Sequence, residues 1–183
     1  MSEHEKGYTP RLAPIQVQAA GTGDVESLSS VLCGAAQEHS VLTHSLLAFV
    51  AIEGGKVSAN LRRRSDLYTL NGYGPYARHF VGRLAKVAPD GNREISTCLP
   101  WAAWLNPMGH TLLHRKRRWC SPCLLKDKAQ GRRPYQRLYW CIGPCTICVH
   151  HRTLLVAYFR PSWTAFQADR GRHFSVIVDG VSD

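Results

Sequence analysis

Cys120-Ser121-Pro122-Cys123 and Cys145-Thr146-Ile147-Cys148, the latter followed by Val149-His150-His151, are the most constraining segments of this 183-residue chain. A Cys-x2-Cys turn lets two sulfurs reach one ion from a single bend, and zinc takes four thiolate or imidazole ligands in a tetrahedron. The pattern predicts one structural zinc ion. One half of the site is Cys120 with Cys123; the other half is either Cys145 with Cys148 or Cys148 with His151.

Other roles for these cysteines fit less well. The chain has seven cysteines, an odd number, and no secretion signal stands at its start, which disfavours a disulfide framework. A thioredoxin-like redox motif needs a βαβ context, which the basic and aromatic flanks do not offer. Independent buried thiols remain as the alternative.

A catalytic zinc is also disfavoured. Residues 144–148, Pro-Cys-Thr-Ile-Cys, match one half of the nucleobase deaminase signature, but the chain contains neither the H-x-E half nor a C-x-E variant of it. Four protein ligands would leave no open position for a reactive water. Since no set of nucleophile, base and orienting residue can be assembled either, the sequence predicts no enzyme and no small-molecule substrate.

Positive charge is concentrated around the cysteines. The formal net charge is +10, and residues 114–137 hold nine Lys or Arg against one acid, Asp127. A cationic stripe beside a metal knuckle suits the phosphates of nucleic acids, while a merely solvated surface is the alternative. The candidate nucleic-acid contacts are Arg115, Lys116, Arg117, Arg118, Arg132, Arg133 and Arg137.

The N-terminal half predicts short amphipathic helices. Asp24 can cap a helix that ends near His39, and Thr43 can cap a second one, stopped by Gly54-Gly55. These two helices resemble a helix-turn-helix, although any small helical core would look the same. The clearest amphipathic pattern covers residues 71–87, with Pro75 in its first turn.

Two further segments complete the predicted elements. Residues 95–105 predict a short helical piece with Trp101 and Trp104 as core anchors, and residues 135–140 predict a short strand. The fold class is therefore mainly α: a small helical, helix-turn-helix-like bundle followed by a zinc knuckle with short β-strands. The predicted division is a flexible N-terminal arm (1–23), a helical domain (24–110), a zinc-knuckle module (111–160) and a C-terminal tail (161–183).

No apolar stretch approaches the ~20 residues needed to cross a bilayer. The longest, such as residues 46–52, would span only a small part of it. The sequence therefore predicts a soluble cytoplasmic protein with no membrane partner, and its charge predicts association with the nucleoid.

The order of these motifs resembles the TniQ family, the TnsD-like target-selection proteins of bacterial transposons. Glu26-Ser-Leu-Ser-Ser30 is similar to the family's helix entry, and Arg118-Trp-Cys-Ser-Pro-Cys-Leu124 is similar to its R-W-C-P-x-C. Pro134-Tyr-Gln-Arg-Leu-Tyr-Trp140 stands in place of Y-x-P-L-L-W, and Cys148-Val-His-His151 in place of C-P-x-H. The likeness covers about residues 14–156.

The resemblance implies a fourth metal ligand and a function. Carried over by position, it assigns Cys120, Cys123, Cys148 and His151 as zinc ligands and leaves Cys145 and His150 as neighbours. It further implies a non-catalytic adaptor in DNA transposition, which recruits an AAA+ transposition ATPase (TnsC-like) to a target DNA or to a guide-RNA complex.

A stand-alone zinc-dependent DNA-binding transcriptional regulator is the alternative function. Its recognition helix would be residues 43–52. That segment contains no Arg, Lys, Asn or Gln to read base edges in the major groove, so we expect its apolar face to pack in a core.

Overall fold

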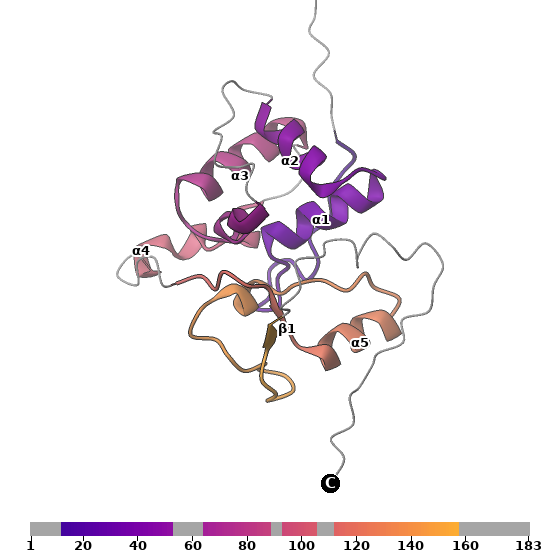
Figure 1. Ribbon diagram of the computed structural model, residues 1–183, viewed down its shortest axis with the longest axis vertical. Helices are drawn as coiled ribbons and strands as arrows, with labels where there is room; N and C mark the ends of the chain where they lie inside the picture. The colour runs from indigo at the N-terminus through magenta and orange to yellow at the C-terminus, as the bar shows by residue number, and fades with distance from the viewer. Residues whose placement is uncertain (1–11, 53–63, 89–92, 106–111, 158–183) are drawn as a thin grey trace, which may run out of the picture.

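The computed structural model describes residues 12–52, 64–88, 93–105 and 112–157, and in this part of the chain the fold is mainly helical (Figure 1). This confirms the predicted fold class. The elements, in order, are α1 (Leu28–Glu38), α2 (Thr43–Ile52), the 3-10 helix η2 (Arg64–Asn71), α3 (Pro75–Val87), the 3-10 helices η3 (Glu94–Ser96) and η4 (Leu99–Trp101), α4 (Ala102–Leu105), β1 (Arg118–Trp119), α5 (Ser121–Ala129), the 3-10 helix η6 (Leu138–Cys141) and β2 (Val156–Ala157).

The main core lies between the first three α-helices. Apolar residues recur at helical spacing on α1, α2 and α3, so each helix turns one face inward. Helix α1 packs against α2 and η2, and α3 packs against the same two elements (Figure 1). Ile15, in the predicted N-terminal arm, is 5% exposed and joins this core. Residues 1–11 of this arm and the predicted tail (161–183) lie outside the described residues.

Helices α1 and α3 begin about one turn later than the sequence suggested, whereas α2 begins at Thr43 as expected. Ser27, not Asp24, is the N-cap residue of α1, because Asp24 is engaged with Arg137 and His150 instead. Helix α3 begins at Pro75, where the missing N–H of proline costs nothing. Asn71 ends η2 and uses its buried side chain to bind Ser29 on α1, with Oδ1 accepting from the Ser29 amide at 2.9 Å.

Helix α2 does not present a reading face. Leu46, Leu47, Val50 and Ala51 are all buried in the main core. The exposed residues of the helix are His44, Ser45 and Ala48. This face therefore offers no Arg, Lys, Asn or Gln to base edges, which argues against the recognition-helix alternative. The Gly54-Gly55 stop predicted for it lies outside the described residues.

The prediction of Trp101 and Trp104 as core anchors was wrong. Their side chains are 45% and 84% exposed. Pro100 breaks residues 95–105 into η3, η4 and α4, and the resulting turns bury Cys98 and its neighbours in place of the tryptophans.

Backbone pairing joins the helical part, up to residue 105, to the cysteine-rich part, residues 112–157. Residues 25–27, just before α1, run antiparallel to residues 136–138: the Ser27 amide donates to the Gln136 carbonyl at 2.9 Å, and the Leu138 amide donates to the Val25 carbonyl at 2.8 Å. Residues 135–140 were predicted to form a strand. In the structure the segment makes this short pairing, with one β-bridge between Glu26 and Arg137, and then turns into η6.

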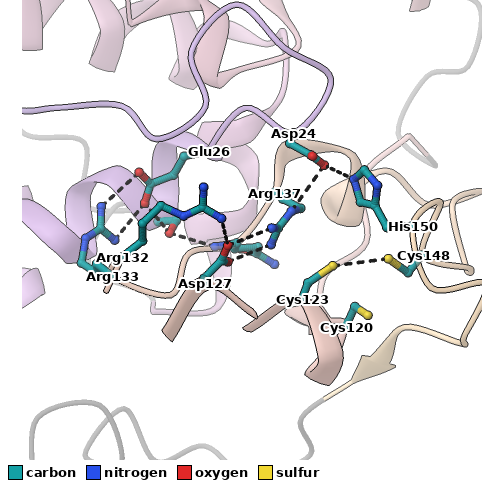
Figure 2. Close-up of polar contacts among 12 residues, drawn as sticks. Asp24, Glu26, Cys120, Cys123, Asp127, Arg132, Arg133, Arg137, Cys148 and His150 are labelled. Atoms are coloured by element: carbon teal, nitrogen blue, oxygen red, sulfur yellow. Dashed lines mark hydrogen bonds and ion pairs between the residues drawn. The ribbon is translucent and has the colours of Figure 1, made fainter. Parts of the chain in front are cut away.

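Two fully buried carboxylates reinforce this junction (Figure 2). Glu26 forms an ion pair with Arg133 at 2.9 Å and accepts a hydrogen bond from the Ser30 hydroxyl at 2.7 Å. Arg133 reaches Glu26 across α1 at Gly34, where a Cβ atom would lie 2.6–2.7 Å from the two terminal guanidinium nitrogens. The small residue is therefore required by the ion pair.

The second carboxylate, Asp127 on α5, is held by two arginines. Its two oxygens accept a forked pair of hydrogen bonds from Arg137, both 3.1 Å long, and Arg132 adds a contact of 2.8 Å (Figure 2). Burial alone would lower the pKa of Arg137, but the bonds to Asp127 outweigh it and raise that pKa. The paired charges thus fix α5 against the segment that joins the helical part.

Breaking this buried pair should be costly. Asp127→Asn removes the charge that compensates Arg137, so we expect the free energy of unfolding to fall by about 3 kcal/mol. Lys126→Gln, at an exposed position of the same helix, is the matched control and should change it by less than about 0.5 kcal/mol. Urea denaturation followed by circular dichroism measures both; equal stabilities of the two variants would contradict this account.

Candidate metal centre

Two segments supply the four side chains of the centre: the start of α5 and a loop near residue 150. Cys120 is the N-cap residue of α5 and Cys123 lies in its first turn, so the start of this helix presents both sulfurs to one side. Cys148 and His151 lie in a tight loop that is closed by the Ile147–Leu154 bridge and by a hydrogen bond of 2.8 Å from the Arg152 amide to the Cys148 carbonyl. Arg152 adopts a left-handed backbone conformation to complete this turn, with φ 53°.

The ligand atoms of Cys120, Cys123, Cys148 and His151 all lie within 4.8 Å of one another. His151 Nδ1 lies 3.4, 3.2 and 3.7 Å from the sulfurs of Cys120, Cys123 and Cys148, and the last two sulfurs are 3.6 Å apart. A tetrahedral ion with bonds of about 2.3 Å to sulfur and about 2.0 Å to nitrogen needs ligand atoms roughly 3.5–3.8 Å apart. The four atoms thus form a compact cluster that can hold one metal ion.

The surroundings of Cys148 favour a thiolate. Burial raises the pKa of Cys148, but hydrogen bonds from the Tyr139 hydroxyl and from the backbone amides of His151 and His150 outweigh it and lower the pKa to about 6. Burial and the contact with Cys148 instead raise the pKa of Cys123. Metal binding therefore has to displace a proton from Cys123, while Cys148 is already prepared as a ligand.

Few apolar residues surround the cluster. The buried residues of this local core are Trp140, Leu155 and the three cysteines themselves, with Trp119, Leu124 and Tyr139 partly buried against them. A group this small cannot hold the segments that carry the ligands by hydrophobic burial alone. Elsewhere in residues 112–157, Leu112 and Leu138 pack with Val25 and Cys98 of the helical part. The local arrangement of the ligand-bearing segments therefore depends on what the cysteines and the histidine bind.

The structure separates the predicted ligands from their neighbours. Cys145 is partly exposed and does not belong to the cluster. His150 points away from it and contacts Asp24 Oδ1 through Nε2 at 2.7 Å (Figure 2). Of the two ligand sets that the sequence left open, the geometry matches Cys148 with His151.

The predicted nucleic-acid contacts divide into exposed and buried residues. Arg115, Lys116 and Arg132 are exposed, whereas Arg117 is half-buried and donates to the Cys33 sulfur. Arg118 is 4% exposed and donates to the carbonyls of Trp140, Ile142 and Gly143 at the end of η6.

The other two arginines of the predicted set are used inside the protein. Arg133 and Arg137 are committed to Glu26 and Asp127. Because their guanidinium groups and that of Arg118 are largely buried against internal carbonyl or carboxylate partners, we leave these three residues out of the surface proposed below. Arg132 also contacts Asp127, but its side chain is 45% exposed and stays in the set.

Several residues with structural roles at the centre were not foreseen from the sequence. Glu26, Asn71 and Gln136 are buried polar residues that connect α1 to the cysteine-rich part. The buried role of a further residue, Asp127, had the clearest signal in the sequence, because it is the one acid within a basic run. An isolated acid among so many cations is well placed to become a buried counter-ion.

Comparison with known families agrees with this geometry. The model of the TniQ family matches residues 18–155, which is most of the chain. The chain belongs to the TniQ family. Membership supports a role in transposition-associated target selection, and TniQ proteins are generally non-catalytic. No curated protein matches the chain, and within the described residues no helix is both long and apolar enough to cross a bilayer.

The stretches that resemble TniQ proteins meet in the structure. The helix entry at residues 26–30 pairs with residues 134–140, and this second segment contributes Trp140 to the core of the metal cluster. The motifs are distant in the sequence but lie together in the structure.

Ligand variants test the geometry of the cluster. We expect Cys145→Ser to retain one metal ion per chain, and both Cys148→Ser and His151→Ala to lose or strongly weaken it, because three ligands hold zinc far less tightly than four. Metal analysis of the purified variants by mass spectrometry gives the stoichiometry. His150→Ala is the control for His151→Ala. Metal loss in Cys145→Ser with full retention in His151→Ala would contradict the assignment.

Proposed function

We propose that this TniQ protein is a non-catalytic, zinc-binding adaptor that links an AAA+ transposition ATPase to target DNA or to a guide-RNA complex, in the cytoplasm and on the nucleoid. The observation that carries the proposal is the compact cluster of three thiols and one imidazole within the residues that the family model matches. Such a site organises surfaces for partners.

Zinc is the ion that this donor set fits best. Three thiolates and an imidazole are soft or borderline ligands, and no carboxylate belongs to the cluster, which disfavours magnesium and calcium. With four protein ligands the ion would have no open position for a substrate or an activated water. Bound there, it would supply folding free energy on the order of 10 kcal/mol.

The cysteine-rich part offers a cationic surface for nucleic acid. In residues 112–157 the one acid is Asp127, and its side chain is fully buried, so no negative charge of a side chain is exposed there. The exposed basic residues that we propose as phosphate contacts are Arg115, Lys116, Lys126, Lys128, Arg132 and Arg152. This set keeps Arg115, Lys116 and Arg132 from the sequence prediction and leaves Arg117 out because it is half-buried.

Salt dependence tests the nucleic-acid part of the proposal. Replacing Arg115 and Lys116 with Gln should reduce the slope of log affinity against log salt by about 1.8, because each lost phosphate contact contributes about 0.9. The control replaces Arg78 and Lys86, two exposed residues on α3, with Gln. This double substitution removes the same amount of positive charge, but from the helical part. Fluorescence anisotropy with duplex DNA measures both, and equal slopes would leave this surface without a specific role.

Assembly with the ATPase tests the adaptor function. The purified protein should co-sediment with the AAA+ ATPase encoded beside it when ATP and DNA are present. A zinc-free sample should not, because the cysteine-rich part loses its fold. If the zinc-loaded protein shows no interaction with the ATPase, the adaptor function is wrong.

A further inference from the structure

Three exposed aliphatic side chains lie next to one another beside the metal cluster, and we call them the aliphatic row: Ile147, Leu154 and Val156. They are 51%, 71% and 55% exposed. Single exposed apolar residues are common on protein surfaces, whereas several on one face are a candidate binding surface.

Backbone pairing places these side chains on one face. Ile147 and Leu154 are opposite each other in an antiparallel bridge, so their side chains point to the same side. Leu154 and Val156 are two residues apart in extended chain and share that side. Val156 is in turn opposite the partly buried Trp119 of β1, which extends the apolar surface.

The opposite face of the same segment is anchored in the local core. Leu155 points to the opposite side, where it is 8% exposed and packs with the three cysteines of the cluster. The row is therefore the outer face of the segment whose inner face covers the metal site. Little conformational entropy would be lost when a partner binds such a fixed surface.

Charge around the row selects the class of partner. Arg152 is exposed in the loop that joins the two bridged positions, and Arg115 is exposed just before β1. Residues 112–157 expose no acidic side chain, and Asp24, which reaches His150 of the same loop, is paired with His150 and Arg137. Phosphates gain nothing from aliphatic side chains, so a nucleic acid fits the basic residues but not the row. A protein segment with aliphatic residues flanked by Asp or Glu complements both features.

We propose that the aliphatic row is the docking surface for the transposition ATPase, through a segment of that protein in which aliphatic side chains are flanked by carboxylates. This inference rests on the adaptor function proposed above. The structural observation behind it is a fixed apolar face with basic borders, directly over the metal site.

The test compares two exposed leucines. Leu154→Ser shortens the row, whereas Leu42→Ser changes a leucine that is 48% exposed between α1 and α2. Both are measured as full-length, zinc-loaded proteins binding the purified ATPase with ATP and DNA. We expect Leu154→Ser to weaken binding about tenfold and Leu42→Ser to leave it unchanged.

The outcomes distinguish this inference from the adaptor function. If the parent protein binds the ATPase and Leu154→Ser binds equally well, the row is not the docking surface although the adaptor function stands. If the parent protein does not bind, both fail. Loss of DNA affinity in Leu154→Ser would assign the row to nucleic acid, and loss of a self-associated state in sedimentation would assign it to a second copy of the chain; either result overturns the proposal.

Discussion

The cluster of Cys120, Cys123, Cys148 and His151 is the constraint on which the cysteine-rich half depends. The four ligand residues lie within a span of 31 positions, from Cys120 to His151. The local core around them consists largely of the ligands themselves. Metal binding at this cluster would therefore add folding free energy that local hydrophobic burial does not supply. The aliphatic row lies on and beside the loop that carries Cys148 and His151, and Lys126 and Lys128 lie on the helix that begins after Cys120.

Buried ion pairs connect the cysteine-rich part to the helical part. Asp127, four residues after Cys123 on α5, is fixed by Arg137, and Arg137 belongs to the segment that pairs with the entry of α1. In the second buried ion pair, the carboxylate is that of Glu26 at the entry of α1, and the arginine is Arg133 of the cysteine-rich part. The cysteine–histidine cluster, the buried ion pairs and α1 are thus consecutive parts of one structure.

Sequence reasoning succeeded where the chemistry is local. The spacing of the cysteines indicated a metal site, and helical periodicity located α1, α2 and α3 to within a few residues. It failed where tertiary partners decide. Arg118 and Arg137 looked like surface cations, but carbonyls and a carboxylate from elsewhere in the fold bury them. Trp101 and Trp104 looked like core residues, but Pro100 and the 3-10 turns expose them.

X-ray absorption at the zinc edge tests the central claim most directly. The account predicts one zinc per chain with a first shell of three sulfurs at about 2.3 Å and one imidazole nitrogen at about 2.0 Å. The imidazole would be that of His151, whose Nδ1 faces the three sulfurs. A shell of four sulfurs would place Cys145 in the site, and a protein that folds fully without any metal would contradict the dependence of this half on the cluster.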